Sequence, residues 1–167
     1  RRRHTRYPLV TGVQTCALPI SSQGTPVTLD NQSTIYAPLI GYPSATPGNA
    51  VLYMSSSGSS WDIASGTVFG PITGNSWVHL ALTRKGSTFY LFYNGVLSNT
   101  ISSSLSVYQS ANTITAGYAQ ATAYFQGFIS NLRVIKGQAL YTQNFTPPAR
   151  KLTRLPGTVD RKSTRLN

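Results

Sequence analysis

A strand–turn–strand pattern in residues 76–101 constrains the fold of this chain more than any other feature. Trp77–Thr83 and Thr88–Tyr93 alternate between apolar and other side chains with a period of two residues, as strands with one buried face do. Asn94-Gly95 follows, a favoured pair for a type I′ hairpin turn because both central residues need positive φ. Val96–Ile101 then returns as a third strand. The pattern predicts an antiparallel meander. The residues expected on one face of its first two strands are Val78, Leu80, Leu82, Phe89, Leu91 and Tyr93.

The flanking sequence favours the same class of structure. Serine, threonine and glycine, which are poor helix formers, separate short runs of aromatic and β-branched residues, and no apolar period of 3.6 residues is sustained. Phe128, Leu132 and Val134 are expected on one face of the last strand. The chain is therefore predicted to be all-β, an antiparallel two-sheet β-sandwich over residues 21–148 with an exit tail at 149–159. The further strands expected are Ile35–Ile40, Ala50–Ser55, Trp61–Ala64, Thr67–Phe69, Ile114–Tyr118 and Tyr124–Ile135.

The two ends of the chain are related through their codons. Asp160–Asn167 (DRKSTRLN) reads as GAT CGG AAG AGC ACA CGT CTG AAC, and the reverse complement of that DNA translates as VQTCALPI, the sequence of Val13–Ile20. No folding requirement produces such a relation. The DNA resembles a standard indexed sequencing adapter, whose outer arm also fits Arg1–Arg6. We therefore expect residues 1–20 and 160–167 to be adapter-derived, to form no domain and to pack poorly, with the sandwich itself incomplete at its N-terminus.

About half of the net positive charge of the chain lies in these ends. The whole chain has 14 Lys+Arg against 3 Asp+Glu, a net charge of +11, whereas residues 21–159 carry 7 basic residues and 2 acids, a net charge of +5. Arg150, Lys151 and Arg154 are expected to be a solvated tail. The body that remains is too weakly charged for the broad basic face of phosphate recognition, so no nucleic-acid partner is expected. No apolar run is long enough for a membrane span.

Two segments resemble the laminin-G-like, or concanavalin A-like, jelly-roll family. In that family a strand rich in Trp and His precedes one that ends in an Asp/Asn-Gly hairpin, as Trp77–Arg84 and Phe89–Leu97 do here. Gly127–Pro148 is similar to the last strand and exit of laminin-G-type modules from phage and environmental (metagenomic) bacterial proteins. The resemblance covers roughly residues 35–148. It implies two stacked sheets and a module that binds glycan or protein within a longer chain. The family's opening apolar strands are not matched, which supports a fragment truncated at its N-terminus.

Few residues offer reactive chemistry. Residues 21–159 contain no Glu and no Cys, which excludes a disulfide, a thiol nucleophile and a Cys-based zinc site. A glycosidase needs two carboxylates beside the scissile bond, and Asp30 and Asp62 share no motif, so no catalytic residue is expected. His79 is expected to be a packed strand residue. Asp62 is the better candidate for a weak calcium site completed by backbone carbonyls, and no other cofactor is expected. Candidates for stacking on sugar rings are the loop and strand-end tyrosines Tyr42, Tyr108, Tyr118 and Tyr124.

The leading functional hypothesis is a non-enzymatic recognition module that binds carbohydrate or protein through its edge loops. By family resemblance it would be extracellular or virion-associated, and the Arg1–Arg3 and Cys16 region, which imitates a signal peptide, is assigned to the adapter. One alternative is a purely structural spacer of a phage tail or surface fibre, without a ligand. A concanavalin A-like glycoside hydrolase fragment is a further alternative, disfavoured by the shortage of acids.

Overall fold

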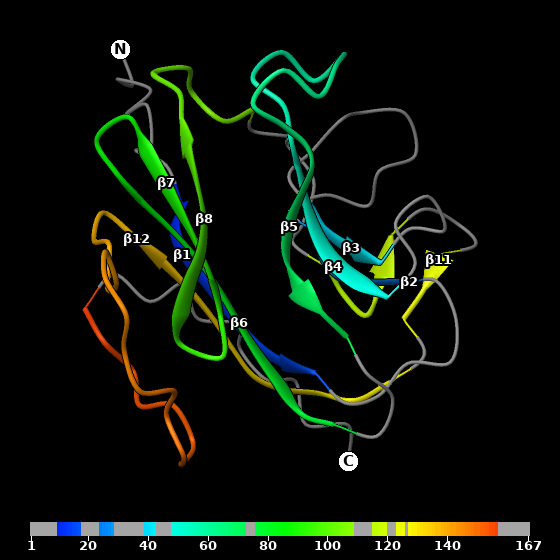
Figure 1. The fold of residues 1–167 in the computed structure, drawn as a ribbon, viewed down its shortest axis with the longest axis vertical. Coiled ribbons are helices and arrows are strands. Elements are labelled where there is room, and N and C mark those ends of the chain that lie inside the picture. Colours follow the sequence, from blue (N-terminus) through cyan, green and yellow to red (C-terminus); the bar gives the residue numbers. More distant parts are fainter. Residues whose placement is uncertain are drawn as a thin grey trace, which may run out of the picture.

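Two antiparallel sheets face each other and enclose the core (Figure 1). The computed structural model describes residues 10–17, 24–28, 39–42, 48–72, 76–108, 115–119, 123–125 and 127–156. The first sheet, here called the β6 sheet, has the order β12 (Ile129–Lys136), β1 (Val10–Ala17), β6 (Val78–Lys85), β7 (Thr88–Tyr93) and β8 (Val96–Ser102). The second, the β4 sheet, has the order β5 (Ala64–Pro71), β4 (Asn49–Met54), β3 (Leu39–Tyr42), β2 (Gly24–Thr28) and β9 (Thr115–Ala116). The short strands β10 (Tyr118–Ala119) and β11 (Ala123–Tyr124) pair with each other. The described strands form the predicted β-sandwich.

The meander of β6, β7 and β8 confirms the strongest prediction from sequence. β6 pairs with β7 from Leu80↔Tyr93 to Lys85↔Thr88, and β7 pairs in turn with β8. Asn94 has φ 49° and Gly95 has φ 81°, the positive values that a type I′ turn requires. The Asn94 side chain also ties the turn to β6, because its Oδ1 accepts the backbone N–H of His79 at 2.8 Å.

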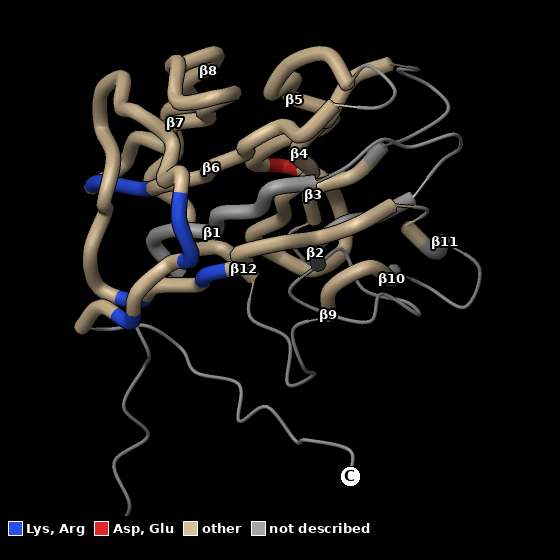
Figure 2. Tube along the Cα trace, turned by 90° about the horizontal axis from the view of Figure 1, so that it is seen from below, with Lys and Arg blue, Asp and Glu red and all other residues tan. Residues whose placement is uncertain are grey.

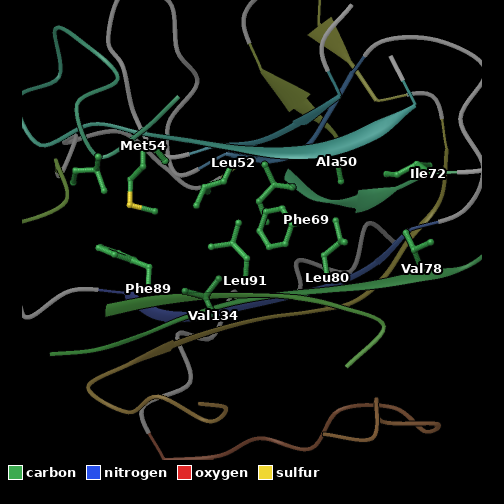
Figure 3. Close-up of a cluster of buried hydrophobic side chains, with 13 residues drawn as sticks. Ala50, Leu52, Met54, Phe69, Ile72, Val78, Leu80, Phe89, Leu91 and Val134 are labelled. Carbon is green, nitrogen blue, oxygen red and sulfur yellow. The ribbon is translucent and has the colours of Figure 1, made fainter. Parts of the chain in front are cut away.

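The core lies between the two sheets. Figure 3 shows Leu52, Met54 and Phe69 pointing from the β4 sheet toward Leu80 and Leu91 of the β6 sheet. Each of these five side chains is at most 2% exposed. The predicted face of β6 and β7 is the one that packs here, since Val78 and Phe89 are also in this cluster and Leu82 and Tyr93 pack against it. Burial of this apolar area supplies the main force that holds the sheets together.

The outer face of the β6 sheet is covered by residues 137–156, here called the exit segment. Phe145 lies edge-on to Phe92 with ring centroids 5.2 Å apart and stacks on Tyr141 at 3.5 Å. The Phe145 N–H donates to the Gly95 carbonyl at 2.9 Å, and the Thr83 hydroxyl donates to the Tyr141 carbonyl. The exit segment is thus anchored to the β7–β8 turn and to β6.

The expectation that residues 1–20 lie outside the sandwich differs from the structure at Val10–Ala17. These residues form β1, which pairs antiparallel with β6 from Gly12↔Thr83 to Ala17↔Val78 without a register shift. β1 also pairs with β12, there with irregularities between Val10 and Gly12 and between Gln14 and Cys16. The segment contains several β-branched residues, which suit strands, and its extended backbone satisfies the open edges of β6 and β12. Residues 1–9 and 160–167 lie outside the described residues.

Several element boundaries also differ from the expectations. Trp61–Ala64 is not a strand, because Trp61 and Asp62 lie in the loop before β5. The strand expected at Thr67–Phe69 is part of the longer β5. Phe128 precedes β12 and is 70% exposed, so it does not share the buried face of Val134. The strand expected over Ile114–Tyr118 is interrupted at Gly117, which has φ 77°. Residues 35–38 and Ile114 lie outside the described residues, and β2 was not predicted.

Candidate functional site

A serine-rich loop between β4 and β5 carries the polar part of the candidate site. The loop spans residues 55–63 and lies at the top of Figure 1, where the chain that leaves β8 crosses toward it. The Ser55 hydroxyl oxygen accepts the backbone N–H of Gly58 at 2.9 Å and that of Ser57 at 3.2 Å. The Ile63 N–H donates to the Met54 carbonyl at 3.1 Å, which holds the two ends of the loop together. Local hydrogen bonds of this kind fix the loop's shape.

Asp62 places a carboxylate on the surface of this loop. Its Oδ1 accepts the backbone N–H of Ser56 at 2.7 Å, and its Oδ2 accepts the Ser56 hydroxyl. The Ser56 hydroxyl, and after it the Ser56 backbone N–H, hold the pKa of the Asp62 carboxyl below its ordinary value. Asp62 is exposed and therefore carries its negative charge at neutral pH. The backbone N–H of Asp62 and the Ser55 hydroxyl lower the pKa of Asp62 further, so local donors of the loop surround the carboxylate.

Three aromatic side chains border the same loop. The rings of Trp61 and Tyr53 lie 5.3 Å apart between centroids at an angle of 50°. Tyr108 donates its backbone N–H to the Ser55 carbonyl at 2.8 Å, and its ring lies against Gly58, where an added Cβ would be 2.8 Å from the ring. All three aromatic residues are half-buried. We call the set Tyr53, Ser56, Trp61, Asp62 and Tyr108 the loop site.

The structure brings together only two of the residues predicted from sequence. Tyr108 and Asp62 both lie at the loop site. Tyr118 and Tyr124 are direct cross-strand partners in the β10–β11 pair, away from the loop in Figure 1. Tyr42 lies on β3 opposite Gly24 of β2. The side chains of these last three tyrosines are outside what the structure describes, and their role stays a prediction. Sequence reasoning missed Tyr53 and Trp61. The available signal was the Trp-Asp pair directly after a serine-rich stretch.

The loop site offers a limited set of metal ligands. Asp62 is the only carboxylate side chain among the described residues, which contain no group of three or more His, Cys, Asp or Glu. Calcium prefers six to eight oxygen ligands. A calcium ion at Asp62 would have to take most of them from serine hydroxyls and backbone carbonyls, and such a site stays a prediction.

His79 is a packed side chain beneath the exit segment. It is 5% exposed, and its ring meets Phe145 edge-on with centroids 5.5 Å apart. Its Nδ1 is buried without a hydrogen-bond partner among the described residues. Burial, and to a lesser degree the nearby Arg133, lower the pKa of the His79 imidazole. A general base needs access to a substrate proton. The His79 ring is buried under Phe145, so its position fits a packed strand residue.

Comparison with known proteins yields one family match and several similar folds. A family model described as the concanavalin A-like lectin/glucanases superfamily (Laminin_G_3) matches residues 18–143. No curated protein sequence matches this chain. The strand β1 precedes the first matched residue. Within the described residues, no helix has the length and apolar character to cross a membrane.

Two solved structures share the fold. One is domain 4 of AbnA, a GH43 extracellular arabinanase from Geobacillus stearothermophilus, in complex with arabinotriose. It has a TM-score of 0.58 and 20% sequence identity, with 78% of this chain and 62% of that chain covered. The other is a putative carbohydrate binding protein from Bacteroides ovatus, with a TM-score of 0.53, 17% identity, and 78% and 39% of the two chains covered. This chain therefore spans less than two thirds of either protein.

Proposed function

The chain belongs to the concanavalin A-like lectin/glucanases superfamily, and from that premise we propose that it is a carbohydrate-binding module whose ligand contacts the loop site. The observation that carries the proposal is the combination of half-buried aromatic rings with an ionised carboxylate around one short loop. An aromatic ring offers an apolar face to the C–H side of a sugar, and polar groups beside it fix the sugar's orientation. Trp61 and Tyr108 supply aromatic faces, and Asp62 supplies acceptors.

The chemistry of Asp62 suits a neutral sugar. Ser56 donates to both carboxylate oxygens and orients the group, and the exposed oxygens can accept further hydrogen bonds from the hydroxyl groups of a sugar. Hydrogen bonds to an ionised group are stronger than those between neutral groups. The negative charge also opposes sugars that carry a carboxylate or sulfate at this position. We therefore propose neutral oligosaccharides as the ligand class of the loop site.

A binding role rather than a hydrolytic one fits the carboxylate geometry. Glycoside hydrolysis uses two carboxyl groups, one of which acts as a general acid with a raised pKa. Asp62 has the opposite environment, because the hydrogen bonds from Ser56 lower the pKa of its carboxyl. We extend the proposal to a non-enzymatic module of a longer extracellular or virion protein. Domain 4 of the arabinanase, which was solved with arabinotriose, is a precedent for a carbohydrate ligand on this fold.

The test is direct binding of neutral oligosaccharides to the full chain. Arabinotriose, a xylo-oligosaccharide and a gluco-oligosaccharide are titrated by calorimetry, after a broader glycan array has ranked candidates. Trp61→Ala and Asp62→Asn should each weaken the binding of a ligand found in this way at least tenfold. The matched control is Trp77→Ala, because Trp77 is the other tryptophan of the chain and is 50% exposed away from the loop.

Each outcome decides between the alternatives. Loss of binding in the Trp61 and Asp62 variants but not in the Trp77 variant supports the loop site. Equal effects in all three variants, or binding that survives both loop changes, place the ligand elsewhere and refute it. No binding across the array favours the structural spacer. Release of reducing sugar from a bound oligosaccharide, abolished in Asp62→Asn, would instead make the chain a hydrolase.

A further inference from the structure

His79 lies at the interface between the β6 sheet and the exit segment. Its neighbours Val78 and Leu80 belong to the core cluster, so the alternation of side chains along β6 turns His79 to the outer face of the sheet. Phe145 covers it there, and the imidazole is 5% exposed. A protonated imidazole carries an N–H donor on both ring nitrogens, and the Nδ1 of His79 has no hydrogen-bond partner among the described residues. The docked position therefore suits the neutral form of His79.

The charged groups near His79 also oppose its protonation. Arg133 of β12 is 8% exposed, and its positive charge disfavours a second cation at His79. Figure 2 shows the lysines and arginines gathered around β12, the neighbouring strand ends and the exit segment, whereas Asp62, the single acid of the described residues, lies apart near β4. Within that part of the chain, a protonated His79 has no carboxylate beside it. The other titratable or polar residues of the elements packed around His79 are its register partner Cys16 on β1, Asn94 of the β7–β8 turn and Tyr141 of the exit segment.

The exit segment packs on the sheet outside the core. The cluster of residues between the two sheets includes none of the described residues that follow β12. Phe92 is fully buried although it lies outside that cluster, because Phe145 covers it edge-on with 5.2 Å between the ring centroids. Removal of the exit segment would thus uncover Phe92 and leave the packing between the sheets in place.

The tail expected at 149–159 is also docked where it is described. The Leu152 N–H donates to Asn131 Oδ1 at 3.4 Å, and Arg133 Nη1 donates to the Thr153 carbonyl at 3.3 Å. Both contacts fix the backbone of the tail on β12. Its basic side chains are exposed: Arg150, Lys151 and Arg154. The cation that opposes protonation of His79 is therefore itself part of the docked interface.

We propose that docking of the exit segment depends on pH: protonation of His79 releases the segment around Phe145 from the outer face while the two sheets stay folded. A released His79 meets water and has the ordinary imidazole pKa, about 6.5. In the docked state burial first, and Arg133 second, lower the pKa of His79. The docked state therefore binds fewer protons than the released state. Docking is strongest above about pH 6.5 and weakens as the pH falls below that value.

The size of the effect follows from the binding of one proton. Each pH unit below about 6.5 should lower the equilibrium constant for docking about tenfold, until the docked imidazole is protonated as well. Release adds an aromatic surface that includes Phe92, so the outer face would be covered at neutral pH and apolar in acid. The inference does not rest on the loop site, and its test needs no ligand.

Amide hydrogen exchange of the full chain, followed by NMR between about pH 7 and pH 5, tests the proposal. The results are compared as protection factors, which remove the intrinsic pH dependence of exchange. The Phe145 amide reports release, because it donates to the Gly95 carbonyl, and the Ile72 amide reports on the β4 sheet, because it donates to the Gly48 carbonyl at 2.7 Å. The test variant is His79→Phe, which keeps an aromatic ring under Phe145 but cannot be protonated.

The matched control is His4→Phe, which replaces the other histidine of the chain at a position outside the described residues. In the parent chain and in this control, the protection factor of the Phe145 amide should fall about tenfold or more between these pH values. It should also stay at least about tenfold below the protection factor of the Ile72 amide, because release needs less free energy than unfolding of the sheets. In His79→Phe the fall at Phe145 should be less than about threefold.

Three results would overturn the proposal. Equal protection of the Phe145 and Ile72 amides in the parent chain would show that the exit segment leaves only when the sheets unfold. A constant protection factor at Phe145 in the parent chain would show that docking does not depend on pH. A fall of the parent's size in His79→Phe would assign the dependence to another group. The first two comparisons use the parent chain alone, so they refute the proposal even where His79→Phe does not fold.

Discussion

Replacing Gly95 with alanine should destabilise the sandwich far more than an ordinary turn substitution does. Gly95 has φ 81°, and a Cβ added there would lie 2.0 Å from the carbonyl oxygen of Phe145 and 2.8 Å from Cδ of Pro147. The carbonyl is backbone, so it cannot move aside as a flexible side chain can. The exit segment itself must shift, which breaks the hydrogen bond from the Phe145 N–H to the Gly95 carbonyl.

The magnitude follows from three contributions. Left-handed backbone in a residue other than glycine costs about 1–2 kcal/mol. Loss of the Phe145–Gly95 hydrogen bond costs about 1 kcal/mol. Displacement of the Phe145 ring from Phe92 and His79 costs about 1 kcal/mol more. We therefore expect Gly95→Ala to lower the free energy of unfolding by about 3–4 kcal/mol.

Gly86→Ala is the matched control. Gly86 also has positive φ, at 60°, in the turn between β6 and β7, but nothing lies within 4 Å of its added Cβ. This variant has the backbone contribution alone, about 1–2 kcal/mol. The difference of about 2 kcal/mol corresponds to roughly 4–8 °C in melting temperature for a domain of this size. Urea unfolding followed by circular dichroism measures both variants. Equal midpoints and slopes would refute the anchoring of the exit segment at Gly95.

Three further predictions concern other parts of the molecule. Because the pKa of His79 is lowered in the folded chain, the unfolded chain binds more protons below about pH 6.5, and the free energy of unfolding should fall as the pH drops through this range. His79→Phe should flatten that dependence between pH 7 and 5 in urea titrations. An unchanged dependence of the free energy of unfolding on pH would contradict the burial of His79. Phe69→Ala should lower the free energy of unfolding by about 3–5 kcal/mol, because Phe69 is 1% exposed between the sheets. A loss below about 1 kcal/mol in the same assay would show that the Phe69 side chain is loosely packed. Ser56→Ala should raise the pKa of the Asp62 carboxyl toward its ordinary value in an NMR titration, whereas Ser59→Ala, on the same loop, should leave that pKa unchanged. If the pKa of Asp62 is the same in the Ser56 variant as in the parent chain, the Ser56 hydroxyl does not donate to the carboxylate.

The meander was predictable from sequence because every level of its structure points the same way. Alternation in Thr88–Tyr93, the Asn94-Gly95 pair and the buried face of β6 are all local signals, and each agrees with the final packing. The last strand was placed less accurately. Phe128 has the correct spacing from Leu132 but lies before β12 begins, since spacing alone does not mark where pairing starts.

The candidate site was only partly predictable for a different reason. Tyr108 joins Asp62 through a contact with Ser55, more than fifty residues earlier in the chain, and no local pattern encodes that contact. Tyr53 reaches the site because β4 turns its residues alternately to the core and to the outside. Leu52 and Met54 face inward, and Tyr53 therefore faces outward toward Trp61. The positions of Tyr53 and Tyr108 at the loop site therefore follow from how the strands pair, which a local sequence pattern does not show.

The central place of β1 has a consequence for how this sheet can be altered. β6 and β12 meet β1 through main-chain pairing along Gly12–Ala17, so one segment satisfies the facing N–H and C=O groups of both neighbours. A replacement segment would need an extended backbone and an alternation of side chains that matches the two faces of the sheet. An isotopic label, a spectroscopic probe or a replacement strand introduced there would report from the middle of the sheet.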